Sequence, residues 1–248
     1  MKFGYYNDKE LPKSLAHKKL IIEGQPTIDY NINSHGYRCP EFSPLPDGKK
    51  NVVVLGCSHT FGVGHAGNTH WVHFLSQHNT ERLRYWNLAQ PGASADKIVR
   101  ILYGAEKVIF PKVIIVCWPS TSRRERLDKI PIDLFGRDKY NRFETEDTDQ
   151  QNFLKNVFLV QKLAEYNQAK VFHCFAEDVQ EMPEEVTNVL DHATLKSCWP
   201  PWDDHDLPEA RKQRITDPNF AQDGIHYGEK HHLAFTELFL NKFRLKLK

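Results

Sequence analysis

The sequence predicts an α/β fold, a three-layer α/β/α sandwich around a parallel sheet. Two observations predict it. Short apolar runs rich in β-branched residues alternate with segments of helical period through most of the chain. The runs are also nearly unbroken, which is typical of strands that are covered on both faces. Such alternation indicates βαβ units with right-handed crossovers, so we expect helices on both sides of the sheet.

Four apolar runs are the expected strands. The three strongest are Asn51–Leu55 (NVVVL), Val113–Cys117 (VIIVC) and Val171–Phe175 (VFHCF), and a weaker one, RYWNL, covers Arg84–Leu88. Each run is bounded by turn residues or followed by a helical period. We therefore expect these four segments to lie in one parallel sheet.

The segments between and after these runs carry apolar residues at helical spacing. Thr69 is the expected N-cap of the first helix and Ser94 that of the second, because a hydroxyl there accepts a hydrogen bond from the first turn. A third helix contains Phe153 to Ala164, and the last begins at about Gly228. One more helix is expected over Glu184–His192.

Composition indicates one domain over residues 1–248. Hydrophobic residues make up 40% of the 248 residues and Gly adds 13, about 5% more, so the apolar share is at the lower edge of the globular range. Residues 1–50 and 176–222 fall outside the alternating pattern. We expect the first to be an arm or small hairpin and the second an irregular insertion, and a long irregular insertion is typical of a segment that covers a site.

Charge and cysteine content exclude several function classes. Lys plus Arg is 33 and Asp plus Glu is 32, so no net field favours a nucleic-acid partner. Five cysteines without a Cys-x-x-Cys indicate a reducing compartment, and thirteen histidines without a ligand spacing predict no metal. No apolar run approaches the ~18 residues of a membrane span, and residues 1–19 lack a signal-peptide core. We therefore expect a cytoplasmic protein without a membrane partner or cofactor.

Three residues form a candidate catalytic set. Ligands bind beyond the carboxyl ends of parallel strands, and Ser58 stands just after the first predicted strand. A serine there is a candidate nucleophile, because nearby backbone N–H groups remain free to bind an oxyanion. Asp223 and His226 supply an orienting carboxylate and a base within one turn of chain. Alternatively, Ser58 is a turn residue and Asp223 caps the last helix, but their joint occurrence at these places favours catalysis.

Two other interpretations of the same loop are disfavoured. Residues 62–67 match G-x-G-x-x-G, but the first glycine is too far from the strand, and no acidic residue ends the second strand. An α/β-hydrolase nucleophile elbow would need a glycine where Thr60 stands.

Several sequence blocks together resemble the SGNH (GDSL-like) hydrolase superfamily. Residues 32–38 (INSHGYR) resemble an element that precedes the serine block in some subfamilies, including uncharacterised phage-encoded ones. The resemblance implies a flavodoxin-like α/β/α fold and activity as an esterase, lipase or carbohydrate acetylesterase. The blocks that carry it are Gly56-Cys57-Ser58-His59-Thr60 with Gly62 and Gly64, then Asn87 and Gly92, then Asp223-Gly224-Ile225-His226.

The resemblance implies Ser58 as nucleophile, His226 as general base and acid, and Asp223 as the residue that orients it. It also implies that the backbone N–H groups of Ser58 and Gly92 bind the oxyanion. The family's Gly-x-Asn-Asp block is absent, since residues 118–121 read Trp-Pro-Ser-Thr. Ser120 is the candidate replacement donor, and losing one such donor costs about 10²–10³ in kcat rather than all activity.

The candidate substrate-contacting residues are His59, Asn87, Trp118, Arg123 and Trp202. We expect His59 to shape the pocket, Arg123 to bind an anionic group, and Trp202 to form an aromatic wall for a sugar. For Ser120 and Arg123 the structural alternative is an ordinary turn followed by a charged helix start, and for Trp202 it is lid packing. Two functions follow: a serine hydrolase of small-molecule or glycan esters, or a catalytically weak glycan-binding module. The sequence does not indicate an oligomeric state.

Overall fold

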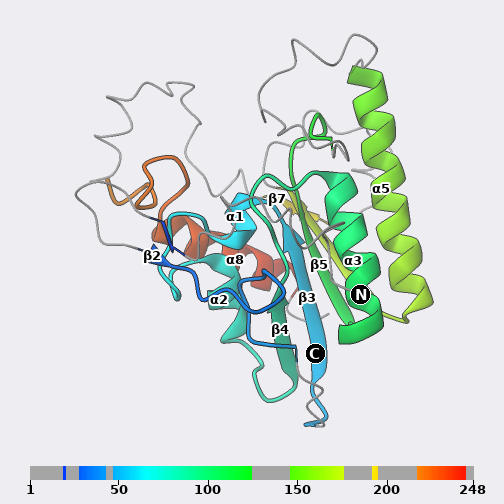
Figure 1. The fold of residues 1–248 in the computed structure, drawn as a ribbon, viewed down its shortest axis with the longest axis horizontal. Coiled ribbons are helices and arrows are strands. Elements are labelled where there is room, and N and C mark those ends of the chain that lie inside the picture. Colours follow the sequence, from blue (N-terminus) through cyan, green and yellow to red (C-terminus); the bar gives the residue numbers. More distant parts are fainter. Residues whose placement is uncertain are drawn as a thin grey trace.

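The computed structural model of the chain describes residues 19–20, 28–42, 47–124, 146–175, 192–194 and 217–243. Five parallel strands form its main sheet in the order β4-β3-β5-β6-β7 (Figure 1). In chain order this is 2-1-3-4-5, the flavodoxin-like arrangement. The predicted fold is confirmed, and the four expected strands lie within one residue of their predicted bounds. The strands are β3 (Lys50–Gly56), β4 (Leu83–Asn87), β5 (Val113–Trp118), β6 (Lys170–Phe175) and β7 (His192–Thr194).

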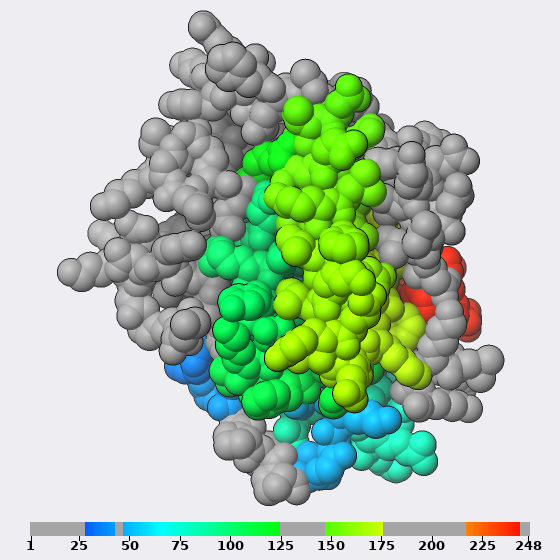
Figure 2. All heavy atoms as spheres, turned by 90° about the vertical axis from the view of Figure 1, so that its right-hand side faces the viewer, coloured from blue at the N-terminus to red at the C-terminus, as the bar shows by residue number. Residues whose placement is uncertain are grey.

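Helices cover both faces of this sheet. Figure 2 views the layer of α3 and α5 from outside, where the two helices lie side by side. The other face carries α2 and α8, and the single turn α1 follows β3 directly. The helices are α1 (Ser58–Phe61), α2 (Trp71–Ser76), α3 (Ala95–Ile109), α5 (Glu146–Tyr166) and α8 (Glu229–Phe243).

Strand β3 shows how the sheet serves two cores. Val53 and Leu55 pack with α3 and α5, whereas Val52 and Val54 pack with α2 and α8. All four side chains are fully buried. Successive side chains of a strand point to opposite faces, so an unbroken apolar run is what a doubly covered strand requires.

Two local predictions need correction. Helix α2 begins after His70, not Thr69, because the Thr69 hydroxyl donates to the Ala66 carbonyl (3.3 Å) instead of capping the helix. His192 was expected to end a helix, but it begins β7, which pairs with the end of β6; residues 184–191 lie outside the described residues. The predicted Ser94 cap is confirmed, since its hydroxyl accepts from the Lys97 N–H (3.3 Å).

The N-terminal arm contains the expected small hairpin. Strands β1 (Lys19–Leu20) and β2 (Ile28–Asp29) pair antiparallel. Further along, the Asn33 side chain holds a tight turn: its Oδ1 accepts from the N–H groups of His35 and Tyr37, both at 3.0 Å. This turn leads the following residue, Arg38, into the interior.

Arg38 fastens the arm to the segment after α1. Its guanidinium donates to the carbonyls of Phe61 (3.0 Å), Gly62 (2.7 Å) and His65 (2.9 Å). The group lies 4.9 Å from the centre of the Tyr30 ring and only 7% of the residue is exposed. Burial lowers the pKa of Arg38 to about 10, so it remains charged at pH 7. Gly62 has φ +80°, and a Cβ there would lie 2.8 Å from His70 Cβ and 2.9 Å from Arg38 Nη1, which explains the glycine.

Buried histidines join α8 to α2 and to the loop before α2. His232 Nδ1 accepts the Trp71 N–H (3.1 Å), and the His232 ring lies 4.3 Å from the ring of His65. Trp71 packs edge-on against Phe235. Burial lowers the pKa of His232 well below 6.5 and that of His65 to about 4. Both rings are therefore neutral in the folded protein at pH 7.

Stability is expected to fall as the pH falls from about 6.5 towards 4. In the unfolded chain these histidines take up a proton near pH 6.5, whereas in the folded chain their lowered pKa keeps them neutral. As the pH falls, the unfolded state therefore binds more protons and is stabilised relative to the folded state. His65 alone accounts for roughly 3 kcal/mol over this range. Thermal unfolding from pH 8 to 4.5 measures the effect. The dependence of the unfolding temperature on pH should be weaker in His65→Gln than in the wild type and unchanged in His78→Gln, whose side chain is exposed. A wild-type unfolding temperature that does not change with pH contradicts the prediction.

Replacing Arg38 with Met is expected to reduce the free energy of unfolding by on the order of 3 kcal/mol. The change removes the donor of the Phe61 and His65 carbonyls and one of two donors of the Gly62 carbonyl, which also accepts the His65 N–H (3.2 Å), and buried polar groups without partners are costly. Urea denaturation followed by circular dichroism measures the loss. Arg82→Met is the matched control, since Arg82 is exposed and such changes stay within about 0.5 kcal/mol. Equal free energies of unfolding of the two variants would show that Arg38 does not hold the N-terminal arm to the segment after α1.

Candidate active site

Ser58 stands at the carboxyl end of β3, as the first residue of α1. The turn that exposes it depends on Gly56, because a Cβ there would lie 2.2 Å from Thr60 Oγ1. The Ser58 carbonyl accepts the N–H groups of Gly62 (2.9 Å) and Val63 (3.1 Å), which closes the turn. The Ser58 N–H takes part in no hydrogen bond within the described residues. The serine is half-buried, and its N–H is available to an oxyanion.

Asp223 and His226 form a tight pair in the loop before α8. Asp223 Oδ2 lies 2.5 Å from His226 Nδ1, and Oδ1 accepts the N–H groups of Ile225 and His226, both at 3.0 Å. The Asp223 side chain is 4% exposed and that of His226 15%. Burial alone would raise the pKa of Asp223, but the hydrogen bonds from His226 and its neighbour lower it below its usual value. The carboxylate thus fixes the orientation of the His226 ring through Nδ1.

The segment after α1 brings this pair to the serine turn. The Gly64 carbonyl accepts the Gln222 N–H (3.1 Å), and His65 Nε2 lies 2.7 Å from the Tyr227 carbonyl oxygen. Gly64 has φ +80°, and a Cβ there would lie 2.9 Å from Asp223 Oδ1. Only glycine allows the carboxylate to pack this closely.

The ring of His59, the residue after Ser58, lies 5.1 Å from the ring of His226. The structure thus brings the three predicted triad residues to one edge of the sheet. No hydrogen bond joins Ser58 to His226 in the part of the chain that the structure describes. Catalytic hydrogen bonds are often long without substrate and shorten in its complex.

The second expected oxyanion donor, Gly92, follows β4. Hydrogen bonds from Leu88 N–H to the Val54 carbonyl (2.9 Å) and from Gln90 N–H to the Gly56 carbonyl (3.1 Å) continue the β3–β4 ladder and place this loop beside the serine turn. Gly92 has φ +69°. Across the described ranges its N–H makes no hydrogen bond, so it is a second free donor at this edge.

Ser120 and Arg123 follow β5, whose end pairs with the end of β3. Ser120 Oγ lies 3.0 Å from Ser122 Oγ, and the Ser120 carbonyl accepts the Arg123 N–H (3.2 Å). Burial lowers the pKa of His59 well below 6.5, and the charges of His226 and Arg123 lower it further. Arg123 is therefore close enough to the His59 ring for its charge to act there.

Asn87 and Trp118 were expected to contact substrate; the structure corrects this for Trp118, and for Asn87 it stays a prediction. Asn87 Nδ2 donates to the Thr60 carbonyl (3.1 Å) and Oδ1 accepts the Ala89 N–H (3.2 Å), so both ends of its amide tie β4 to α1. Trp118 is fully buried in the core under α5, and its indole donates to His173 Nδ1 (2.8 Å). As the last residue of β5 rather than the first of a loop, Trp118 points into the sandwich. Trp202 lies outside the described residues.

Sequence reasoning placed Arg38 in the block of residues 32–38 but missed its connecting role and that of His65, because the partners of both side chains are backbone carbonyls that no residue type marks. It also left Gly62 and Gly64 unexplained, whereas the structure shows that they make room for Arg38 and Asp223.

Among the described residues, no cluster of three or more His, Cys, Asp or Glu side chains could hold a metal ion. No helix in the described ranges is long and apolar enough to cross a membrane.

No family model and no curated protein matches this chain. Similar solved structures include a lipolytic protein of the G-D-S-L family from Veillonella parvula, with 14% identity, a TM-score of 0.52, and coverage of 79% of this chain and 98% of that one. The crystal structure of TesA is similar at 14% identity and a TM-score of 0.51, with coverage of 79% and 99%. At this identity the likeness concerns the fold. The parallel sheet and its flanking helices give this chain the SGNH, or GDSL-like, α/β/α fold.

Proposed function

We propose that this protein is a serine hydrolase that cleaves carboxylic esters. The observation that carries the proposal is the buried Asp223–His226 pair on the same sheet edge as Ser58 and two unused backbone N–H groups. Acyl transfer requires a nucleophilic hydroxyl, an oxyanion site, and a base that a carboxylate holds in place. The similar G-D-S-L protein is described as lipolytic, which agrees with this chemistry.

In the proposed mechanism, Ser58 Oγ attacks the ester carbonyl while His226 Nε2 takes its proton. The N–H groups of Ser58 and Gly92 stabilise the negative oxygen of the tetrahedral intermediate, with Ser120 as a further donor. His226 then gives its proton to the leaving alcohol, and an acyl-enzyme remains. His226 next activates a water molecule that releases the acid, while Asp223 stays ionised and stabilises the imidazolium.

The site favours a small acyl group. The buried His59 ring packs against His226 and, at 5.6 Å, against Tyr227, and so fills space beside the nucleophile. We propose acetyl esters of carbohydrates as the substrate class, with Arg123 facing any anionic group on the alcohol portion. The protein needs no cofactor for this reaction.

A second candidate function is a glycan-binding module with weak catalysis. Two observations favour it: the absence of a hydrogen bond between Ser58 and His226 within the described residues, and the missing Gly-x-Asn-Asp block. The same residues would then contact the sugar without cleaving it.

A fluorophosphonate probe is expected to label the wild-type protein and not Ser58→Ala, because only an activated serine attacks phosphorus. Hydrolysis of p-nitrophenyl acetate should fall at least about a thousandfold in the same variant. Ser34→Ala removes an exposed hydroxyl of the arm and should behave like the wild type. Labelling of Ser58→Ala would refute the nucleophile, and a folded wild type that neither labels nor hydrolyses would favour the binding module.

Asp223→Asn is expected to lower kcat about 10³–10⁴-fold with little change in KM. The amide cannot hold the His226 tautomer or stabilise the imidazolium. Steady-state kinetics with p-nitrophenyl acetate measure the effect. Asp217→Asn is the matched control in the same loop, since its side chain accepts the Asn219 N–H (2.8 Å), which an amide oxygen also accepts. Similar rates for both variants would remove Asp223 from the mechanism.

A further inference from the structure

One side chain joins the nucleophile and the base of the proposed active site. His59 directly follows Ser58 in α1, and its ring packs edge-to-face with the ring of His226, with 5.1 Å between the ring centres and 67° between the ring planes. The His59 ring also packs against the Tyr227 ring, at 5.6 Å, and the residue is only 9% exposed. His59 thus belongs by sequence to the serine turn and by contact to the histidine loop.

The backbone that carries His59 is closed by hydrogen bonds. The Phe61 N–H donates to the Cys57 carbonyl and the Gly62 N–H donates to the Ser58 carbonyl, both at 2.9 Å. These two bonds span His59. The His59 ring and the Ser58 hydroxyl therefore project from one and the same turn, so a contact of this ring also relates its partner to the hydroxyl.

The His226 ring has a restraint at one nitrogen and needs another for its orientation. Asp223 Oδ2 lies 2.5 Å from Nδ1. A hydrogen bond weakens steeply only when its angle falls below about 120°, so this bond alone allows a range of ring tilts. Packing against a second ring narrows that range. The tilt matters because misplacing a reacting atom by about 1 Å can slow a reaction about 10²-fold.

The His59 ring makes this contact without carrying a charge. Burial lowers its pKa well below 6.5, and the nearby charges of His226 and Arg123 lower it further. Asp223 acts in the opposite direction, and His65 adds to the lowering. His59 is therefore neutral at pH 7. A cation beside His226 would oppose the imidazolium that forms during acyl transfer, whereas a neutral ring does not.

We propose that His59 is a positioning residue: its ring holds the imidazole of His226 at the tilt that directs Nε2 to the Ser58 hydroxyl. The contact is between two rings, so it depends on the flat shape of the side chain at position 59 and not on its nitrogen atoms. No proton passes through His59. The inference rests on the proposed hydrolase function, in which His226 is the base, and it adds an effect on rate to the space that His59 fills.

Two substitutions separate ring packing from hydrogen bonding. His59→Phe keeps a flat ring without nitrogen atoms, and His59→Gln keeps polar atoms without a ring. With p-nitrophenyl acetate, kcat is expected to stay within about threefold of the wild type in His59→Phe and to fall about 10–100-fold in His59→Gln. KM should change less than about twofold in both, because the ring acts on the transition state and not on substrate binding.

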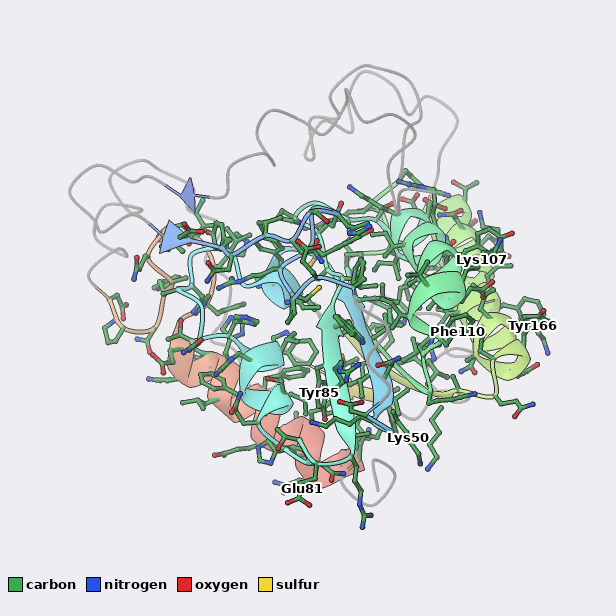
Figure 3. The ribbon with its side chains drawn as sticks, turned by 60° about the horizontal axis from the view of Figure 1, so that its bottom comes forward. Lys50, Glu81, Tyr85, Lys107, Phe110 and Tyr166 are labelled. Carbon is green, nitrogen blue, oxygen red and sulfur yellow. The ribbon has the colours of Figure 1, made fainter. Side chains whose placement is uncertain are left out.

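Tyr85→Gln is the matched control for the loss of a ring. Figure 3 shows Tyr85 on β4, and its side chain packs against the core that also contains Tyr227, under α2 and α8. Tyr85 pairs with Val52, whereas the serine turn follows Gly56 at the other end of β3. This variant removes a ring from the same core without touching His226, so its kcat should stay unchanged. Circular dichroism verifies that each variant is folded.

Ring-proton NMR of His226 in the full chain gives a readout that needs no hydrolysis. Nuclear Overhauser effects should join the ring protons of His226 to those of residue 59 in the wild type and in His59→Phe. In His59→Gln the His226 ring signals should broaden or split, because the ring adopts more than one tilt. If the wild type neither hydrolyses esters nor labels with a fluorophosphonate, the proposed function fails, and the NMR signals alone decide whether His59 orients His226.

Any of four results would overturn the proposal. These are an unchanged kcat in His59→Gln, an equal loss of kcat in His59→Phe, an equal loss in Tyr85→Gln, and the absence of the Overhauser effects in the wild type. The second would assign a hydrogen bond or a proton transfer to His59, and the third would assign the loss to a weakened core. The last measurement uses no variant, so it decides the matter even where a substitution prevents folding.

Discussion

The contact between Arg38 and the carbonyls of Phe61, Gly62 and His65 is the constraint on which the rest of the site depends. The segment that it holds places Gly64 against Asp223 and His65 against the Tyr227 carbonyl. The arm, the serine turn and the histidine loop are therefore one connected unit. Charge-assisted hydrogen bonds to three carbonyls offset the cost of burying the guanidinium.

The cluster of glycines after Ser58 shows that one pattern can have different physical causes. In a dinucleotide-binding loop such glycines let a pyrophosphate approach the backbone. Here a Cβ on Gly62 would meet His70 as well as the Arg38 guanidinium, a Cβ on Gly64 would meet Ala221 as well as the Asp223 carboxylate, and both glycines have left-handed backbone conformations. The protein's own charged side chains thus occupy the places where a ligand's groups would lie.

Much of the fold could be predicted from the sequence because β3 to β6 are apolar runs that parallel sheets require. Strand β7 could not, since three residues carry no periodic signal. A similarly local effect explains the corrected site residue, Trp118. Side chains of a strand point alternately to its two faces, so a residue faces the core or a ligand according to whether the strand still includes it. Trp118 lies on the same face as Val116, in the core under α5. Ser58, Asp223 and His226 were predictable because their residue types and their positions relative to strands agree.

Asp223 and His226 come from a single turn of four residues, and this has a mechanical consequence. Their mutual geometry is fixed locally by hydrogen bonds within the turn, so it travels with the loop as a rigid body. The hydrogen bonds of Gly64 and His65 to this loop then set its position relative to the serine turn, so a substitution in that segment displaces both side chains together.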